Sequence, residues 1–124
     1  MSTIAWLLLI AALLPIVATG IAKAGDKSFD HNNPRAWMTT LSGYRARASA
    51  AQANIFEGLP FFFAAVLFAV FNQVDLQSLR NLMLLWIGLR LAYIACYIAN
   101  KGMLRSIVWG GCLAVNIVIL FTTV

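Results

Sequence analysis

Residues 45–63 read RARASAAQANIFEGLPFFF, and this stretch decides the fold because it places polar groups inside an otherwise apolar segment. If the segment is a helix, with 100° per residue, Arg47, Asn54 and Glu57 fall within an arc of roughly 80° on one face. An apolar helix with one polar stripe is typical of a membrane span that faces lipid on one side and a polar cavity on the other. Glu57 therefore predicts a membrane-embedded site.

The composition supports the membrane interpretation. The chain has 124 residues, of which 62% are hydrophobic and 10% charged, and its mean hydropathy is +0.85. This composition is too apolar for an ordinary soluble domain. A bilayer core about 30 Å thick requires about 20 apolar residues per helix, so the chain has room for four spans with short loops. We expect an all-α integral membrane protein, a four-transmembrane-helix bundle that forms a single domain over residues 1–124.

We expect the four spans approximately at residues 4–21, 45–71, 79–99 and 103–121. The stretch between the first two is the only long polar one, and its Gly, Asp, Asn and Pro content predicts a loop. Within it, Asn33-Pro34 predicts a turn or a short interfacial helix, with Trp37 at headgroup depth. His31 has no Cys or acidic partner at ligand spacing, so we expect a solvated histidine and no metal site.

Lysine and arginine gather at one side of the predicted bundle. The first and third loops with their flanks contain Lys23, Lys27, Arg35, Arg45, Arg47, Lys101 and Arg105, whereas the second loop has only Arg80. Positively charged loops stay in the cytoplasm, so we expect loops one and three to be cytoplasmic and both termini outside. The basic residues form no patch with interleaved aromatic residues, which argues against nucleic acid as a partner.

A second polar stripe lies on the third predicted span. The loop between the second and third spans is short, so the two spans are expected to lie antiparallel and side by side. Trp86, Arg90, Tyr93 and Tyr97 recur there at intervals of three and four residues. Arg90 and Glu57 both lie about 15 Å deep along their helices. An unpaired charge at that depth costs about 3 kcal/mol on insertion scales, so we expect the two to pair with each other or to share a hydrated cavity. A purely structural tie between the helices is the alternative.

The residue types near the two stripes suit a small zwitterionic ligand with several carboxylates. Arginine binds carboxylates in a bidentate fashion, glutamate accepts from an ammonium group, and asparagine pairs with a peptide. Glutathione carries all these groups, and a nearby arginine would favour its nucleophilic thiolate over the thiol. For Tyr93 and Tyr97, anchoring at the membrane interface is an equally good interpretation.

The combined motifs resemble those of the MAPEG family, the membrane-associated proteins of eicosanoid and glutathione metabolism. The motifs are Asn33-Pro34, Arg47-Ala48, Gln52-x-Asn54-x-x-Glu57-x-x-Pro60, Arg90-x-x-Tyr93-x-x-x-Tyr97 and Arg105-Ser106. The resemblance covers nearly the whole chain and is to a bacterial-type member. It implies a four-helix protomer, a homotrimer in the bacterial inner membrane, and glutathione bound between neighbouring subunits near the cytoplasmic side.

The resemblance also implies roles for individual residues. Those expected to contact glutathione are Asn54, Glu57, Arg90, Tyr93 and Tyr97. Arg105 matches the arginine proposed to stabilise the thiolate. Members with glutathione chemistry usually carry an arginine four residues before the asparagine, where this chain has Ala50. Arg47, one turn earlier on the same face, is the candidate substitute.

The leading expectation is a microsomal-type glutathione transferase or peroxidase that acts on hydrophobic electrophiles dissolved among the membrane lipids. Two alternatives remain open. The Ala50 departure keeps open a MAPEG-fold protein without catalysis that serves as a membrane binding or assembly module. One membrane-embedded carboxylate among four short helices also fits a small proton-coupled multidrug exporter, although exporters of that type carry the glutamate on their first helix without an arginine partner.

Overall fold

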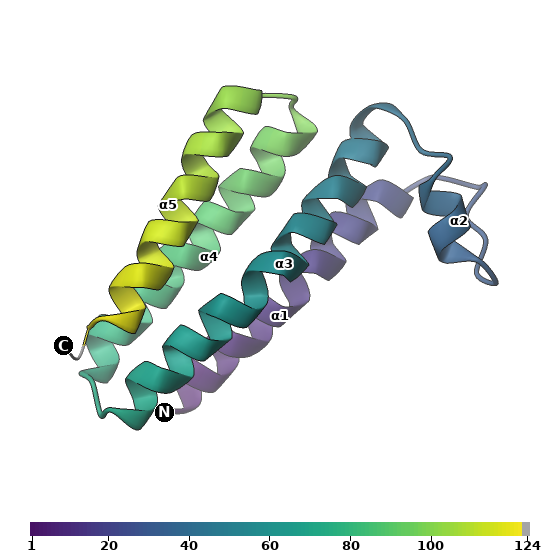
Figure 1. Cartoon of the computed structure of the whole chain (residues 1–124). Helices are drawn as coiled ribbons and strands as arrows, with labels where there is room; N and C mark the ends of the chain where they lie inside the picture. Colours follow the sequence, from purple (N-terminus) through teal and green to yellow (C-terminus); the bar gives the residue numbers. More distant parts are fainter. Residues whose placement is uncertain (123–124) are drawn as a thin grey trace.

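The computed structural model describes residues 1–122 and contains four long helices and one short one (Figure 1). The helices are α1 (Ser2–Lys23), α2 (Pro34–Met38), α3 (Gly43–Phe71), α4 (Leu76–Ile98) and α5 (Gly102–Leu120). Each long helix is long and apolar enough to cross a membrane. Their ends lie within three residues of the predicted spans, and the short helix begins at the predicted Asn33-Pro34 turn. The all-helical, four-span prediction is therefore confirmed.

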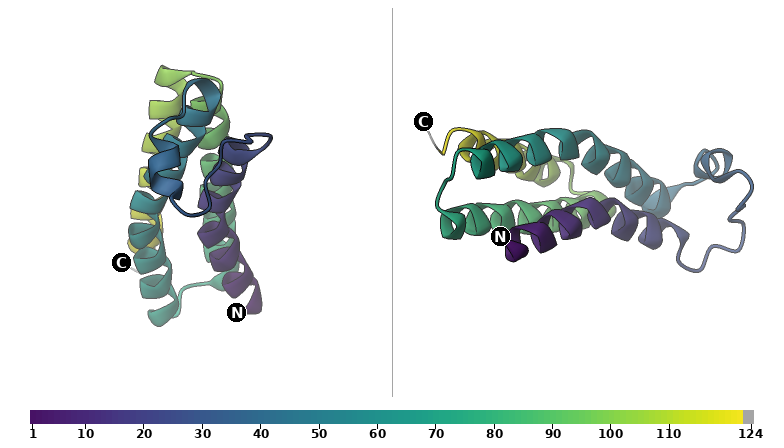
Figure 2. Two further views of the ribbon diagram at one scale, coloured as in Figure 1. Left: turned by 90° about the vertical axis from the view of Figure 1, so that its right-hand side faces the viewer. Right: turned by 90° about the horizontal axis from the view of Figure 1, so that it is seen from below.

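The long helices form two antiparallel pairs, α1 with α3 and α4 with α5, and α3 also packs against α4 and α5 (Figure 1). The beginning of α1 and the end of α5 lie at one end of the bundle. The loop of residues 24–42 and the turn of residues 99–101 lie at the other end, which we call the loop end. The two further views show that α2 projects past the helices at the loop end (Figure 2). Because α1 also packs against α4, the four long helices form a bundle in which α1 and α4 lie on one side and α3 and α5 on the other (Figure 2).

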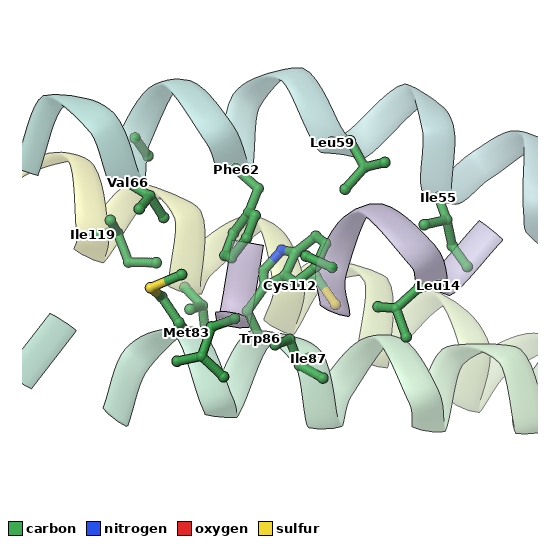
Figure 3. Close-up of a cluster of buried hydrophobic side chains, with 14 of the residues drawn as sticks. Leu14, Ile55, Leu59, Phe62, Val66, Met83, Trp86, Ile87, Cys112 and Ile119 are labelled. Atoms are coloured by element: carbon green, nitrogen blue, oxygen red, sulfur yellow. The ribbon is translucent and has the colours of Figure 1, made fainter. Parts of the chain in front are cut away.

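The apolar core lies where all four long helices meet (Figure 3). At its centre the Phe62 ring of α3 stacks on the Trp86 ring of α4, with centroids 3.9 Å apart and planes 15° from parallel. Alanines of α1 and α3, including Ala11 and Ala65, are fully buried in this core, and such small side chains allow helix backbones to approach closely. Since the aromatic stack holds α4 against α3, it also fixes the rotation of both polar stripes.

A second small core joins the loop of residues 24–42 to Ala22 of α1 and Ala48 of α3, and it is centred on Trp37, which is only 5% exposed. The Trp37 Nε1–H group donates to Asp26 Oδ2 at 3.2 Å and to Ser28 Oγ at 3.3 Å. The edge of the Phe29 ring packs against the indole, with centroids 4.9 Å apart. The headgroup depth of Trp37 stays a prediction, and its ring is buried against Ala22 and Ala48. Trp37 therefore stabilises the loop connecting α1 to α3.

The protonation of Asp26 is expected to loosen this loop. Hydrogen bonds from the Ser28 hydroxyl and backbone, and a weaker one from Trp37, lower the pKa of the Asp26 carboxyl below its ordinary 3.8. A lowered folded-state pKa means that Asp26 stabilises the loop above pH 3.8 and that the contribution is lost as pH falls through the lower value. We expect the NMR signal of the Trp37 indole N–H, assigned with Trp37→Phe, to shift in that window. Asp26→Asn should abolish the shift, and an unchanged titration in that variant would contradict the prediction.

Candidate functional site

Three adjoining cavities lie in the groove between α3, α4 and α5. The inner cavity has a volume of about 270 Å³ and is lined by Asn54, Glu57, Gly58, Phe61, Arg90, Trp109, Leu113 and Asn116. The middle cavity, about 190 Å³, is lined by Asn54, Tyr93, Arg105, Ser106 and Trp109. The outer cavity, about 210 Å³, is lined by Arg47, Cys96, Tyr97, Asn100, Lys101, Gly102 and Arg105. Neighbouring cavities share wall residues, so together they form one polar groove that leads from the bundle interior to the loop end.

The polar groove brings together every residue that was predicted to contact glutathione or its thiolate. The residues are Arg47, Asn54, Glu57, Arg90, Tyr93, Tyr97 and Arg105. They come from three helices, and the two polar stripes predicted for the second and third spans face each other across the groove. Glutathione binding by these residues stays a prediction.

Arg90 is the most deeply buried charge of the groove, and its side chain is only 3% exposed. Its Nη1 donates to Asn54 Oδ1 at 3.1 Å, and its Nε has no hydrogen-bond partner within residues 1–122. The Trp86 and Tyr93 rings flank the guanidinium, with centroids 5.2 and 5.5 Å from Cζ. A buried guanidinium with only one neutral partner is electrostatically uncompensated, which favours an anion as its additional partner.

The direct ion pair between Glu57 and Arg90 is absent from residues 1–122, so of the two predicted arrangements only a shared cavity is present. The reason lies in Gly58. A Cβ at Gly58 would overlap Arg90 Nη2 and lie 3.2 Å from Cζ, which shows that the guanidinium packs directly against the α3 backbone. In that position it meets Asn54, whereas the Glu57 side chain lines the same cavity and is exposed.

Arg105 lies where the middle and outer cavities meet. Its guanidinium covers the Tyr97 ring, with Cζ 4.4 Å from the centroid, and the Tyr93 ring packs edge-on against Tyr97 at 5.7 Å. Tyr93 is buried and Tyr97 is half-buried, so Tyr93 does not have the exposure that an interfacial anchor needs. The aromatic pair holds Arg105 over the groove.

Arg47 is placed differently from the arginine that it was expected to replace. Its Nε donates to the Ile98 carbonyl of α4 at 3.1 Å, and it lines the outer cavity rather than the inner one. Asn54 is seven residues, about two turns, further along α3. Arg47 therefore adds positive charge near the loop end, away from Asn54 and Glu57.

Sequence reasoning missed Gly58, Trp109 and Asn116 as wall residues of the groove. The position of Asn116 was predictable from helical periodicity. Asn116 follows Arg105 by 11 residues, a spacing that places both side chains on the same helix face within roughly 20°. Trp109 lies between them on that face. Gly58 had no such signal, since nothing in the sequence indicates that a side chain from another helix packs on it.

Four apolar helices of membrane-spanning length, enclosing a charged groove, define a multi-pass integral membrane protein of the helical-bundle class. The family model of the MAPEG family matches residues 3–124. The chain therefore belongs to the MAPEG family, as its motifs suggested. No curated protein and no solved structure shows a significant match to the chain.

Proposed function

We propose that the protein is a membrane-bound glutathione-dependent transferase or peroxidase for hydrophobic electrophiles. The observation that carries the proposal is the charge of the polar groove. Within residues 1–122 its walls contain four cationic side chains and one carboxylate, namely Arg47, Arg90, Lys101, Arg105 and Glu57. Glutathione carries two carboxylates, one ammonium and one thiol, which is the complementary set of charges.

The positions of these groups support a division of tasks. Arg90 and Asn54 offer guanidinium and amide donors to a carboxylate at the inner end, and Glu57 offers an acceptor to the ammonium group beside it. Arg105 then acts on the sulfur, because a cation near a thiol favours the thiolate. In conjugation of an aryl halide, the thiol loses its proton to solvent, a bond forms between sulfur and carbon, and the halide leaves.

We further propose a homotrimer in the bacterial inner membrane, with the loop end in the cytoplasm. Glu57 is exposed on the isolated chain although it belongs to the groove. On the other side of α3, a separate cavity of about 660 Å³ between α1, α2 and α3 presents Lys23, Arg35 and Gln52. A neighbouring subunit that placed this second polar surface against the groove would enclose the ligand between subunits.

The role of Glu57 provides the test of the binding mode. We expect purified protein to bind glutathione in calorimetry about tenfold more tightly than N-acetylglutathione, because acetylation removes the ammonium group and a hydrogen bond to a charged group is worth about 1.5–3 kcal/mol. Glu57→Gln should weaken glutathione binding by about the same factor and abolish the difference between the two ligands. The proposal fails if trimeric wild-type protein binds no glutathione and conjugates no generic aryl halide.

The position of Arg47 favours a second candidate function. Because Arg47 bonds to the Ile98 carbonyl and Ala50 replaces the usual arginine, the groove could bind glutathione without turning it over, as a membrane binding or assembly module. Binding with no turnover, unaffected by Arg105→Ala, would identify that function. Proton-driven substrate uptake by vesicles that vanished in Glu57→Gln would instead identify an exporter.

A further inference from the structure

A separate cavity on the α1–α4 side of the bundle has apolar walls. It has a volume of about 460 Å³ and is lined by Val17, Ile21, Leu91, Ile94, Ala95, Ile98 and Ala99. The two helices are long and apolar enough to cross a membrane, and they lie side by side (Figure 2). From Leu91 to Ala99 the cavity runs about 12 Å along α4, so it reaches the loop end. We call it the α1–α4 cavity.

The α1–α4 cavity lies apart from the surfaces that the proposed trimer uses. The polar groove lies between α3, α4 and α5, and the second polar surface lies between α1, α2 and α3. Neither shares a wall residue with the α1–α4 cavity. In a bilayer this side of the bundle borders lipid, and an empty apolar cavity would lose dispersion contacts with its surroundings. The expected occupant is therefore the acyl chain of a lipid.

Two arginines of α3 lie where the α1–α4 cavity meets the loop end. Arg47 Nε donates to the carbonyl of Ile98, a wall residue of the cavity, at 3.1 Å. Arg45 Nη1 donates to the carbonyl of Ala22 at 2.7 Å, and Ala22 directly follows the wall residue Ile21. The apolar cavity therefore ends beside positive charge. A phospholipid has the matching arrangement, because its phosphate lies at the end of its acyl chains.

Arg45 is the arginine that remains available to a phosphate. It lines neither the polar groove nor the second polar surface, whereas Arg47 lines the outer cavity of the groove. The bond to Ala22 uses only one N–H of the half-buried Arg45 guanidinium. Its acidic neighbour Asp26 already accepts hydrogen bonds within the loop of residues 24–42. Arginine binds phosphate through paired N–H groups, so Arg45 can hold a headgroup.

We propose that the α1–α4 cavity and Arg45 form a binding site for one anionic glycerophospholipid, such as phosphatidylglycerol, with an acyl chain in the cavity and the phosphate on Arg45. Basic pockets between transmembrane helices bind anionic headgroups. The loop of residues 24–42 and its flanks contain more lysine and arginine than aspartate, which favours an anionic over a zwitterionic headgroup. The lipid site goes beyond the proposed function and does not depend on glutathione.

Native mass spectrometry of the purified full-length protein tests this proposal. The protein, freed of lipid in detergent, is titrated with palmitoyl-oleoyl phosphatidylglycerol or with the phosphatidylcholine that carries the same acyl chains. We expect one tightly bound lipid per chain. Phosphatidylglycerol should bind about fivefold more tightly than phosphatidylcholine, the effect of about one basic residue near an anionic headgroup.

Charge variants separate a defined site from a diffuse attraction between charges. Arg45→Gln should reduce the preference for phosphatidylglycerol to near unity, whereas Arg45→Lys keeps the charge and should keep most of the preference. Lys27→Gln, the same loss of charge at an exposed residue of the loop, should leave the preference intact.

A cavity variant tests the position of the acyl chain without changing any charge. Ala95→Leu places a larger side chain in the cavity, so it should weaken the binding of both lipids about fivefold, through the loss of roughly ten atomic contacts. Ala92→Leu, at an exposed alanine of α4 that does not line the cavity, should bind both lipids like wild type. If Arg45→Gln does not fold without its bond to Ala22, this exposed pair of positions decides.

Several results would overturn the proposal. Equal affinity of wild-type protein for the two lipids would remove the headgroup site, and an equal loss of preference in Lys27→Gln and Arg45→Gln would mean diffuse attraction. Undiminished binding in Ala95→Leu would place the acyl chain elsewhere, and a changed oligomeric mass in that variant would mean that a second copy of the chain covers the cavity. These measurements involve no glutathione, so a failure here is distinguishable from a failure of the proposed function.

Discussion

Arg105→Ala is expected to lower kcat for glutathione conjugation by about 10²-fold, the usual effect of removing one group that stabilises developing charge. The affinity for glutathione should change much less, because the bound thiol is neutral when Arg105 is absent. The rate of the variant should recover as pH rises, since higher pH restores the thiolate that the cation no longer favours. Stopped-flow measurement of thiolate absorbance and steady-state kinetics across pH would separate the two quantities.

Two controls accompany this experiment. Arg105→Lys keeps a positive charge over the Tyr97 ring and should retain part of the activity, although lysine lacks the planar geometry of arginine. Arg80→Ala removes an arginine outside the polar groove, where its Nη2 bonds to Gln77 at 2.6 Å, and should leave kcat unchanged. Equal kcat in wild type and Arg105→Ala would remove Arg105 from the mechanism.

Gly58→Ala is expected to have the second large effect, although it adds only one methyl group. The new Cβ would overlap Arg90 Nη2, so the guanidinium must leave its place and lose the bond to Asn54. Overpacking of this kind costs about 1–3 kcal/mol. We expect a lower melting temperature by circular dichroism and at least tenfold weaker glutathione binding by calorimetry.

Other helical glycines provide the matched control. Nothing lies within 4 Å of a Cβ built at Gly88 or Gly110, so alanine there should stabilise the helix by roughly 0.5–1 kcal/mol. If Gly88→Ala stabilised the protein and Gly58→Ala destabilised it, the contact with Arg90, and not helix propensity, would determine the sign of the stability change at Gly58. If Gly58→Ala bound glutathione like wild type, the position of Arg90 would not matter for the ligand.

Much of the fold was predictable because one rule dominates it. A span must present about 20 apolar residues, and the four apolar runs, separated by turn residues, predicted the helix ends to within three residues. The orientation of the stripes was also predictable, since the period of 3.6 residues places Asn54 and Glu57 on one face and Arg90, Tyr93 and Tyr97 on another. Two helices that are antiparallel neighbours then bring those faces together.

The details of the site were less predictable, because periodicity gives depth and direction without contacts. Matched depth predicted either an ion pair between Glu57 and Arg90 or a shared cavity. The missing side chain of Gly58 leaves space into which the guanidinium packs, beside Asn54, so the shared cavity is the arrangement that forms. Likewise, helical spacing predicted Arg47 on the same face as Asn54. In the structure the Arg47 side chain donates a hydrogen bond to the Ile98 carbonyl at the end of α4. Both outcomes depend on neighbouring helices that the sequence of one span does not describe.

The inner cavity is lined by Trp109 and Leu113 of a membrane-spanning helix, and this has a consequence for enzymology. If the electrophile arrives through the lipid, the relevant concentration is its mole fraction in the membrane rather than its molarity in the buffer. Adding lipid or detergent at constant protein and substrate would then dilute the substrate in two dimensions and slow the reaction, whereas the response to glutathione, which arrives from water, would stay the same. Apparent Michaelis constants for the two substrates would thus refer to two different phases.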